Sequence, residues 1–114
     1  MQNLPSNPSA EAALIGAVLF ENRAFARAAE HVRADQFYSE SFAQIWSDIG
    51  ERIRSGNVAD PITLKADYDP ELLADLLDSA CYGPEIDDYA RLIADCAQRR
   101  ALIEAGHVLA KEAE

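Results

Sequence analysis

Two cysteines and two histidines are the residues of this chain best suited to binding a soft metal ion. Cys81 and Cys96 lie fifteen positions apart, and His31 and His107 complete the set. No pair of them has the Cys-x-x-Cys or His-Glu-x-x-His spacing that presents two ligands together. A zinc site would need all four side chains to converge through the fold, so we predict no metal site. Cys96 falls on an apolar helical stripe and is predicted to be a buried small hydrophobic residue.

Adjacent carboxylates at Asp87 and Asp88 are the best candidates for acid–base chemistry. General acid–base catalysis needs a cleft and a positioned partner group, and the sequence indicates neither. Three acids between Glu85 and Asp88 are typical of a helix N-terminus, where the helix dipole favours negative charge. Ser39 and Ser41 have no His and Asp in a recognisable triad arrangement. We predict that the chain is not an enzyme; a small hydrolase built on Asp87 and Asp88 is the enzyme alternative.

The five glycines do not form a phosphate-binding loop. Neither GxxxxGK[ST] nor GxGxxG occurs, so no backbone cradle for a nucleotide is predicted. The sequence therefore indicates no cofactor for this chain.

Charge argues against binding to nucleic acid. Ten Lys and Arg residues oppose twenty Asp and Glu residues, which gives a net charge of −10. No basic residue occurs between Lys65 and Arg91, where eight acids are found. Tight binding to DNA depends on Lys and Arg contacts with phosphate, and an acidic surface repels polyanions. We predict no direct DNA binding and interpret the acidic segment as a solvated face.

The elements that must position these residues are all predicted to be helices, because the chain is rich in Ala and poor in Gly. A helix through residues 42–55 carries apolar residues at helical spacing, including Trp46 as a predicted core residue. Asp60-Pro61 and Asp69-Pro70 each supply an N-cap followed by a proline at the first helical position. The predicted helices cover 8–20, 23–32, 42–55, 61 through Leu64 or on to Tyr68, 70–81 and 85–111.

Two further features bear on packing. Gly16 costs a helix about 1 kcal/mol relative to Ala, so we expect a close helix–helix approach there. Residues 34–39 are predicted to be a non-helical joint whose Phe37 and Tyr38 plug the core. The predicted fold class is all-α: a small orthogonal bundle of about five to six helices with a long C-terminal helix.

The last helix carries an apolar stripe that continues past the point where the preceding helices could cover it. Ile103, His107 and Leu109 are therefore predicted to form an exposed seam. Such seams usually pack on another helix or another subunit.

Three stretches together resemble the N-terminal domain of bacterial replicative DNA helicases of the DnaB type. PSAEAALIGAVLFEN (8–22) is similar to that family's EAE-x-x-x-LG-x-x-L-x-DN opening. ADQFYSESFAQIWSDIGERIRSGNVADPITL (34–64) is similar to its D-x-FY-x-x-x-H-x-x-IF pattern and the D-x-x-TL that follows. YARLIADCAQRRALIEAG (89–106) is similar to its YA-x-I-x-x-x-x-x-x-R-x-LI stretch. The matches follow the family's order and cover about half of the chain.

The chain departs from the family pattern at several positions. Ser9 stands where the first Glu of EAE is usual, and Phe42 stands where a His is common. The segment 66–88 is shorter and more acidic than usual and lacks the GG-x-x-YL element. These departures indicate a divergent or phage-like member.

Residues 1–7 are polar and contain a proline, so they are predicted to be a flexible leader. The resemblance implies a helicase N-terminal helical domain over 8–114. In that family the long helix begins a helical hairpin that pairs subunits, and the domains form a collar on a hexameric ring that recruits primase. The implied partners are further copies of the parent helicase, primase and a helicase loader. No secretory signal precedes the two cysteines and no apolar run is long enough to span a bilayer, so the sequence itself predicts a cytoplasmic location and no membrane partner. ATP and Mg²⁺ would belong to a motor domain that this chain lacks.

For the assembly role, the resemblance directs attention to the last helix. Arg100 matches the arginine of R-x-LI, and we expect it to form a structural salt bridge. The alternative is the helicase-binding domain at the C-terminus of a primase, or a free-standing helical adaptor of the replisome. The predicted interface residues are Tyr89, Ile93, Arg100, Ile103, His107 and Leu109.

Overall fold

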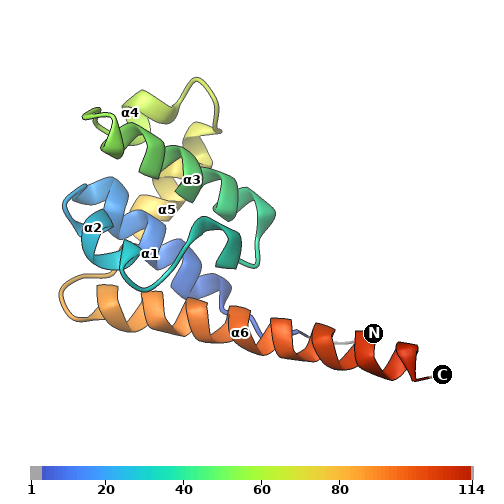
Figure 1. The fold of residues 1–114 in the computed structure, drawn as a ribbon. Coiled ribbons are helices and arrows are strands. Elements are labelled where there is room, and N and C mark those ends of the chain that lie inside the picture. Colours follow the sequence, from blue (N-terminus) through green and yellow to red (C-terminus); the bar gives the residue numbers. More distant parts are fainter. Residues whose placement is uncertain (1–3, 114) are drawn as a thin grey trace.

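The computed structural model describes residues 4–113 and contains six α-helices, one 3₁₀ helix and no strand in that range. The predicted all-α class is confirmed, and the helices surround a single core (Figure 1). The elements are α1 Pro8–Phe20, α2 Ala24–Ala29, η1 Ala34–Gln36, α3 Glu40–Arg54, α4 Pro61–Leu64, α5 Pro70–Asp78 and α6 Glu85–Glu112.

Several boundaries differ from those predicted, and α3 begins two residues earlier, at Glu40. Helix α2 ends at Ala29 rather than at residue 32, because the chain turns through residues 30–32 to an extended Arg33. The joint that follows contains the 3₁₀ turn η1, in which the Gln36 side chain accepts a hydrogen bond from the Arg33 N–H. Helix α5 ends at Asp78, and the chain reaches α6 through residues 79–84.

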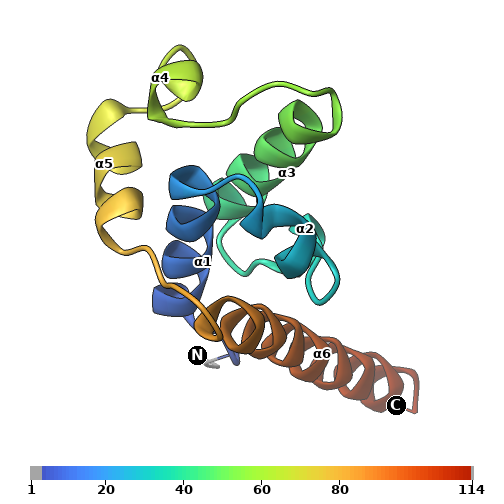
Figure 2. The same ribbon diagram turned by 90° about the vertical axis from the view of Figure 1, so that its left-hand side faces the viewer.

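Helix α1 is the centre of the bundle and packs against α2, α3, α5 and α6 (Figures 1 and 2). It begins after Asn7, whose side chain accepts a hydrogen bond from the Ala10 N–H. Leu14, Ile15 and Val18 are fully buried, as expected for a helix covered on most sides.

Gly16 lies where α1 closely approaches α5, as the sequence predicted. A Cβ atom built there would overlap the carbonyl oxygen of Leu76 and lie 3.0 Å from the Cα of Ala80. The absence of a side chain therefore sets the spacing of these two helices.

Aromatic rings fill the space between α2, α3 and η1. Trp46 is buried, as predicted, with its ring centroid 5.2 Å from those of both Phe25 and Phe37. The expectation that Phe37 and Tyr38 together plug the core is correct only for Phe37. Tyr38 is half exposed, because it lies beneath the guanidinium group of Arg100 instead.

Residues 4–7 of the predicted leader are half-buried and have no regular secondary structure, and the rest of that leader lies outside the described residues. Helix α6 crosses the base of the bundle and continues beyond it (Figure 1).

Candidate interaction surface on the C-terminal helix

Helix α6 has two halves with different surroundings. Ile86, Ala90, Ile93 and Cys96 of the first half are buried against the bundle. From Ala101 onward the side chains are exposed, apart from a half-buried Ile103. We call residues 102–113 the arm.

The apolar face of the arm points away from the bundle. Leu102 follows buried Ile93 by nine positions, which is about two and a half helical turns, so the two side chains project to opposite sides of α6. Leu109 lies about two turns after Leu102 and therefore shares its face. Leu102 is 72% exposed and Leu109 is 66% exposed. The bundle of the same chain cannot cover these residues.

Small residues lie between the two leucines on this face. Ala105 and Gly106 separate them, and Ala113 continues the stripe by one more turn. Nothing lies within 4 Å of the position that a Cβ atom of Gly106 would occupy. The arm thus presents an apolar face with space for close approach by another helix.

Arg100 anchors the root of the arm. Its guanidinium group donates hydrogen bonds to the carbonyl oxygens of Pro5 at 2.7 Å and Gln36 at 2.8 Å. It also lies over the ring of Tyr38, 5.1 Å from the centroid. The prediction that Arg100 forms a salt bridge is wrong for the described residues. Its guanidinium group contacts two backbone carbonyl oxygens and an aromatic ring instead of a carboxylate.

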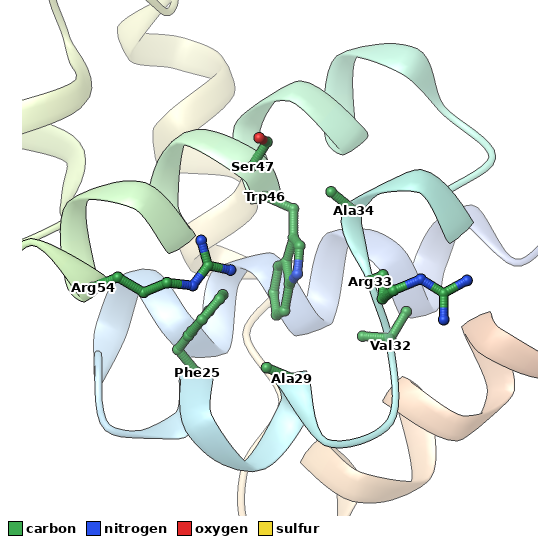
Figure 3. A pocket seen from close by; sticks show the side chains of 8 residues that line it. All are labelled: Phe25, Ala29, Val32, Arg33, Ala34, Trp46, Ser47 and Arg54. Carbon is green, nitrogen blue, oxygen red and sulfur yellow. The ribbon is translucent and has the colours of Figure 1, made fainter.

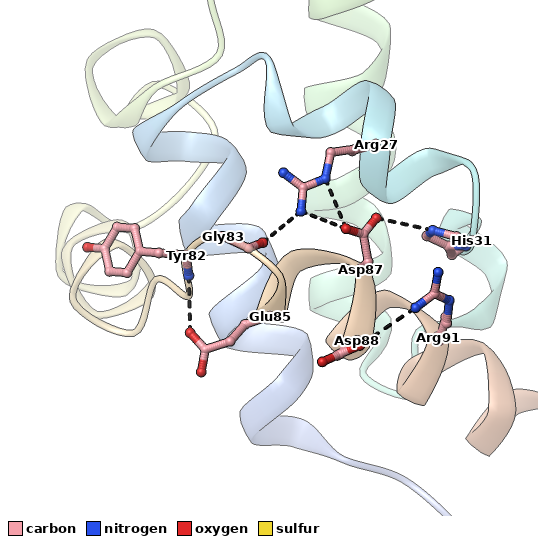
Figure 4. A network of polar contacts seen from close by, with 8 residues as sticks. All are labelled: Arg27, His31, Tyr82, Gly83, Glu85, Asp87, Asp88 and Arg91. Atoms are coloured by element: carbon pink, nitrogen blue, oxygen red, sulfur yellow. Dashed lines mark hydrogen bonds and ion pairs between the residues drawn. The ribbon is translucent and has the colours of Figure 1, made fainter.

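The first turn of α6 is fixed by a polar network centred on Asp87 (Figure 4). Arg27 of α2 donates to Asp87 Oδ2 at 2.6 Å and to the carbonyl oxygen of Gly83 at 2.7 Å. His31 Nε2 lies 3.2 Å from Asp87 Oδ1. The hydrogen bond and charge of Arg27 hold the pKa of Asp87 below its usual value. The sequence indicated only a helix N-terminal acid here, since its partners lie more than fifty residues away.

The predicted interface residues lie in three kinds of place. Ile93 is 1% exposed and belongs to the core, so it holds α6 on the bundle. Tyr89 is half-buried, and its hydroxyl donates to Glu85. His107 and Leu109 are exposed on the arm, with Ile103 partly covered beside them. Leu102 was missed as a surface residue, although its spacing from Gly106 and Leu109 is that of one helical face.

No group of three or more metal-ligating side chains comes together in residues 4–113. Cys81 and Cys96 are both buried and reduced, and the prediction for Cys96 is confirmed. None of the described helices is long and apolar enough to cross a bilayer.

Comparison with known proteins gives one consistent family. Residues 3–95 match the family described as DnaB-like helicase N terminal domain. The chain is 30% identical to the replicative DNA helicase DnaB of Treponema pallidum (strain Nichols), over 96% of this chain and 27% of that protein. It is 29% identical to the DnaB of Rickettsia felis, over 96% of this chain and 24% of that protein. The chain thus spans about a quarter of the length of these relatives.

A solved structure shares the fold. The crystal structure of the N-terminal domain of DnaB helicase from Mycobacterium tuberculosis superposes with a TM-score of 0.88, at 24% sequence identity. The match covers 96% of this chain and 83% of that one.

Proposed function

Because the chain belongs to the family of DnaB-like helicase N-terminal domains, we propose that it is a non-catalytic assembly module, which joins helicase subunits through the arm of α6. The observation that carries the proposal is the exposed apolar face of Leu102 and Leu109, which points away from the bundle. An exposed apolar stripe on a helix is stabilised when a second helix covers it.

The parent protein would be an ATP-dependent DNA helicase that forms a hexameric ring in the cytoplasm. ATP and Mg²⁺ would be bound by a motor domain, for which residues 4–113 supply no phosphate-binding loop. The domain would act by contact with proteins: other copies of the helicase, a primase and a loader. The relatives that match are themselves helicases, which favours this role over a primase domain or a free-standing adaptor.

The assembly role is tested by analytical ultracentrifugation of the wild type and of Leu102→Asp, Leu109→Asp and Ile103→Asp variants over a range of concentrations. We expect Leu102→Asp and Leu109→Asp each to weaken self-association at least tenfold, because burying one unpaired charge costs more than about 1.4 kcal/mol. Ile103 lies beside that face and is partly covered by its own chain, so Ile103→Asp should have a smaller effect.

Val108→Asp is the matched control. Val108 is 55% exposed on the same arm but lies off the Leu102–Leu109 face. It should leave both self-association and the circular dichroism spectrum unchanged. Equal weakening by Val108→Asp, or a wild type that remains monomeric at high concentration, would contradict the arm as the contact.

Docking of a primase is tested separately by sedimentation of the domain with and without a candidate primase. Co-sedimentation that persists in the Leu109→Asp variant would assign docking to the bundle, and its loss would assign docking to the assembled arm.

A further inference from the structure

A cavity of about 250 Å³ opens between α2 and α3, on a part of the bundle separate from the arm (Figure 3). Phe25 and Val32 form apolar walls, and Trp46 lies between Arg33 and Arg54. This volume is below the roughly 300–1,000 Å³ typical of sites for whole small-molecule ligands, so it fits a single side chain better than a nucleotide.

The indole N–H of Trp46 opens into this cavity. Trp46 is only 3% exposed, yet its N–H makes no hydrogen bond to any residue of 4–113. No side-chain nitrogen or oxygen in that range is both buried and unpaired, so this N–H must reach solvent, and the cavity that Trp46 lines provides the opening. An indole N–H can only donate, so it calls for an acceptor.

The charged groups that line the cavity are both cations. Arg54 lies over the Phe25 ring at 5.5 Å and forms no ion pair with a described residue. Arg33 lies 3.3 Å from Asp35, but both side chains are more than 70% exposed. Exposed pairs of this kind contribute little, so Arg33 can exchange Asp35 for another carboxylate.

The segment around the cavity is electrically neutral, so it does not repel an anion as the acidic remainder of the chain does. Residues 23–54 contain five arginines and five acids, so the whole net charge of −10 lies outside this segment. The Arg54 guanidinium group lies on the Phe25 side of Trp46, and the Arg33 guanidinium group extends outward at the rim of the cavity (Figure 3). Together with the indole N–H, these donors are complementary to a carboxylate whose neighbouring residues are apolar.

We propose that this cavity binds a carboxylate side chain from an acidic segment of a partner protein, with a neighbouring apolar side chain of that segment packed on Val32 and Phe25. The arginines bind the carboxylate, and the Trp46 N–H donates to one of its oxygens. This site does not depend on self-association through the arm.

Trp46 is the only tryptophan of the chain, so it reports directly on the cavity. The probe is an acetylated and amidated peptide, Gly-Leu-Asp-Glu-Leu-Gly, titrated into the full chain while Trp46 fluorescence and the indole N–H signal in a ¹H–¹⁵N spectrum are followed. The matched probe replaces Asp and Glu by Asn and Gln.

We expect saturable changes in both signals with the acidic peptide and none with the neutral one. Arg54→Gln and Arg33→Gln should each weaken binding about tenfold, because each removes a charge-assisted hydrogen bond, and Arg54→Lys should retain part of the affinity. Arg91→Gln, on the exposed face of α6, should bind as the wild type does. Circular dichroism checks that each variant is folded.

Four outcomes would overturn the proposal. The neutral peptide could shift the indole signal equally, which would make the site merely apolar. Inorganic phosphate could compete at equal concentration, which would make it a site for small anions. Arg91→Gln could weaken binding as much as Arg54→Gln, which would make the attraction non-specific. The indole signal could change with protein concentration alone, which would place a second copy of the chain in the cavity.

Discussion

Glu11 is the one charged residue that is buried in residues 4–113. Its carboxylate accepts hydrogen bonds from the backbone N–H groups of Tyr38 at 2.8 Å and Ser39 at 3.3 Å. Ser39 is the N-cap of α3, so the charge of Glu11 also lies at the positive end of that helix. A residue that the sequence indicated only as a first-turn acid of α1 thus connects α1 to the start of α3.

Replacing Glu11 tests this connection. Glu11→Ala should lower the free energy of unfolding by about 2–3 kcal/mol, because two backbone donors lose a charged acceptor. Urea denaturation followed by circular dichroism measures the change. Glu40→Ala, at an exposed position in the first turn of α3, should cost well under half as much. Equal costs would show that the contribution of Glu11 is only that of a general helix N-terminal charge.

Two glycines should respond to alanine in opposite directions. Gly16→Ala forces a Cβ atom into the backbone of α5 and should destabilise the fold by about 2–3 kcal/mol. Gly106→Ala meets no neighbour and should stabilise the helical arm by up to about 1 kcal/mol. Thermal unfolding of both variants checks the pair. A Gly16→Ala variant as stable as the wild type would mean that α1 and α5 separate without cost.

The contact between Asp87 and Arg27 should make the free energy of unfolding depend on pH, with a definite sign. Arg27 lowers the pKa of Asp87 in the folded state, so the stabilisation is complete above the ordinary value of 3.8 and is lost as the pH falls through the lowered pKa. Between about pH 6 and about pH 3, the free energy of unfolding should therefore decrease more in the wild type than in Asp87→Asn.

Chemical denaturation at a series of pH values makes this comparison. Asp88→Asn is the control, since Asp88 forms only an exposed ion pair with Arg91 at 3.6 Å. Parallel pH curves for the wild type and Asp87→Asn would contradict a stabilising role for the Arg27–Asp87 pair.

At the scale of elements, local sequence patterns predicted most of the helices. The features that they did not predict depend on contacts between residues far apart in the sequence. The helical spacing around Ile45 and Ile49 and the Asp-Pro caps describe interactions within a few residues, so α3, α4 and the start of α5 could be predicted. Arg100 could not be assigned its carbonyl partners, because these lie 64 and 95 residues away. The direction of the arm's apolar face was also missed, since it requires knowing which side of α6 meets the bundle.

The two halves of α6 should differ in backbone protection. At low protein concentration, amides from Ile86 to Ala97 should exchange slowly with deuterium because the core covers them. Amides from Glu104 onward should exchange fast, because helical turns without tertiary packing open readily. Hydrogen exchange followed by mass spectrometry measures both. Uniform protection along α6 in the dilute monomer would contradict this division.

At the scale of the whole molecule, the charge of −10 sets a prediction about nucleic acid. At about 0.15 M salt the domain should not change the fluorescence anisotropy of a labelled single-stranded oligonucleotide, because a chain with this net charge repels polyanions. Lowering the salt tenfold should not produce binding either. Saturable binding that weakens with added salt would contradict this expectation and would direct attention to the arginines of α2 and α3.

The buried and exposed apolar faces of α6 lie on one continuous helix. The number of residues between Ile93 and Leu102 therefore sets the angle between these two faces around the helix axis. Each residue turns the helix by about 100°, so one residue inserted between Ile93 and Leu102 would rotate the direction of the arm's apolar face by that angle. Every side chain that makes either contact would stay the same. Seven inserted residues would nearly restore the phase and move the contact outward by about 10 Å. The direction in which the arm presents its apolar face therefore depends on the length of α6 as much as on the identities of its residues.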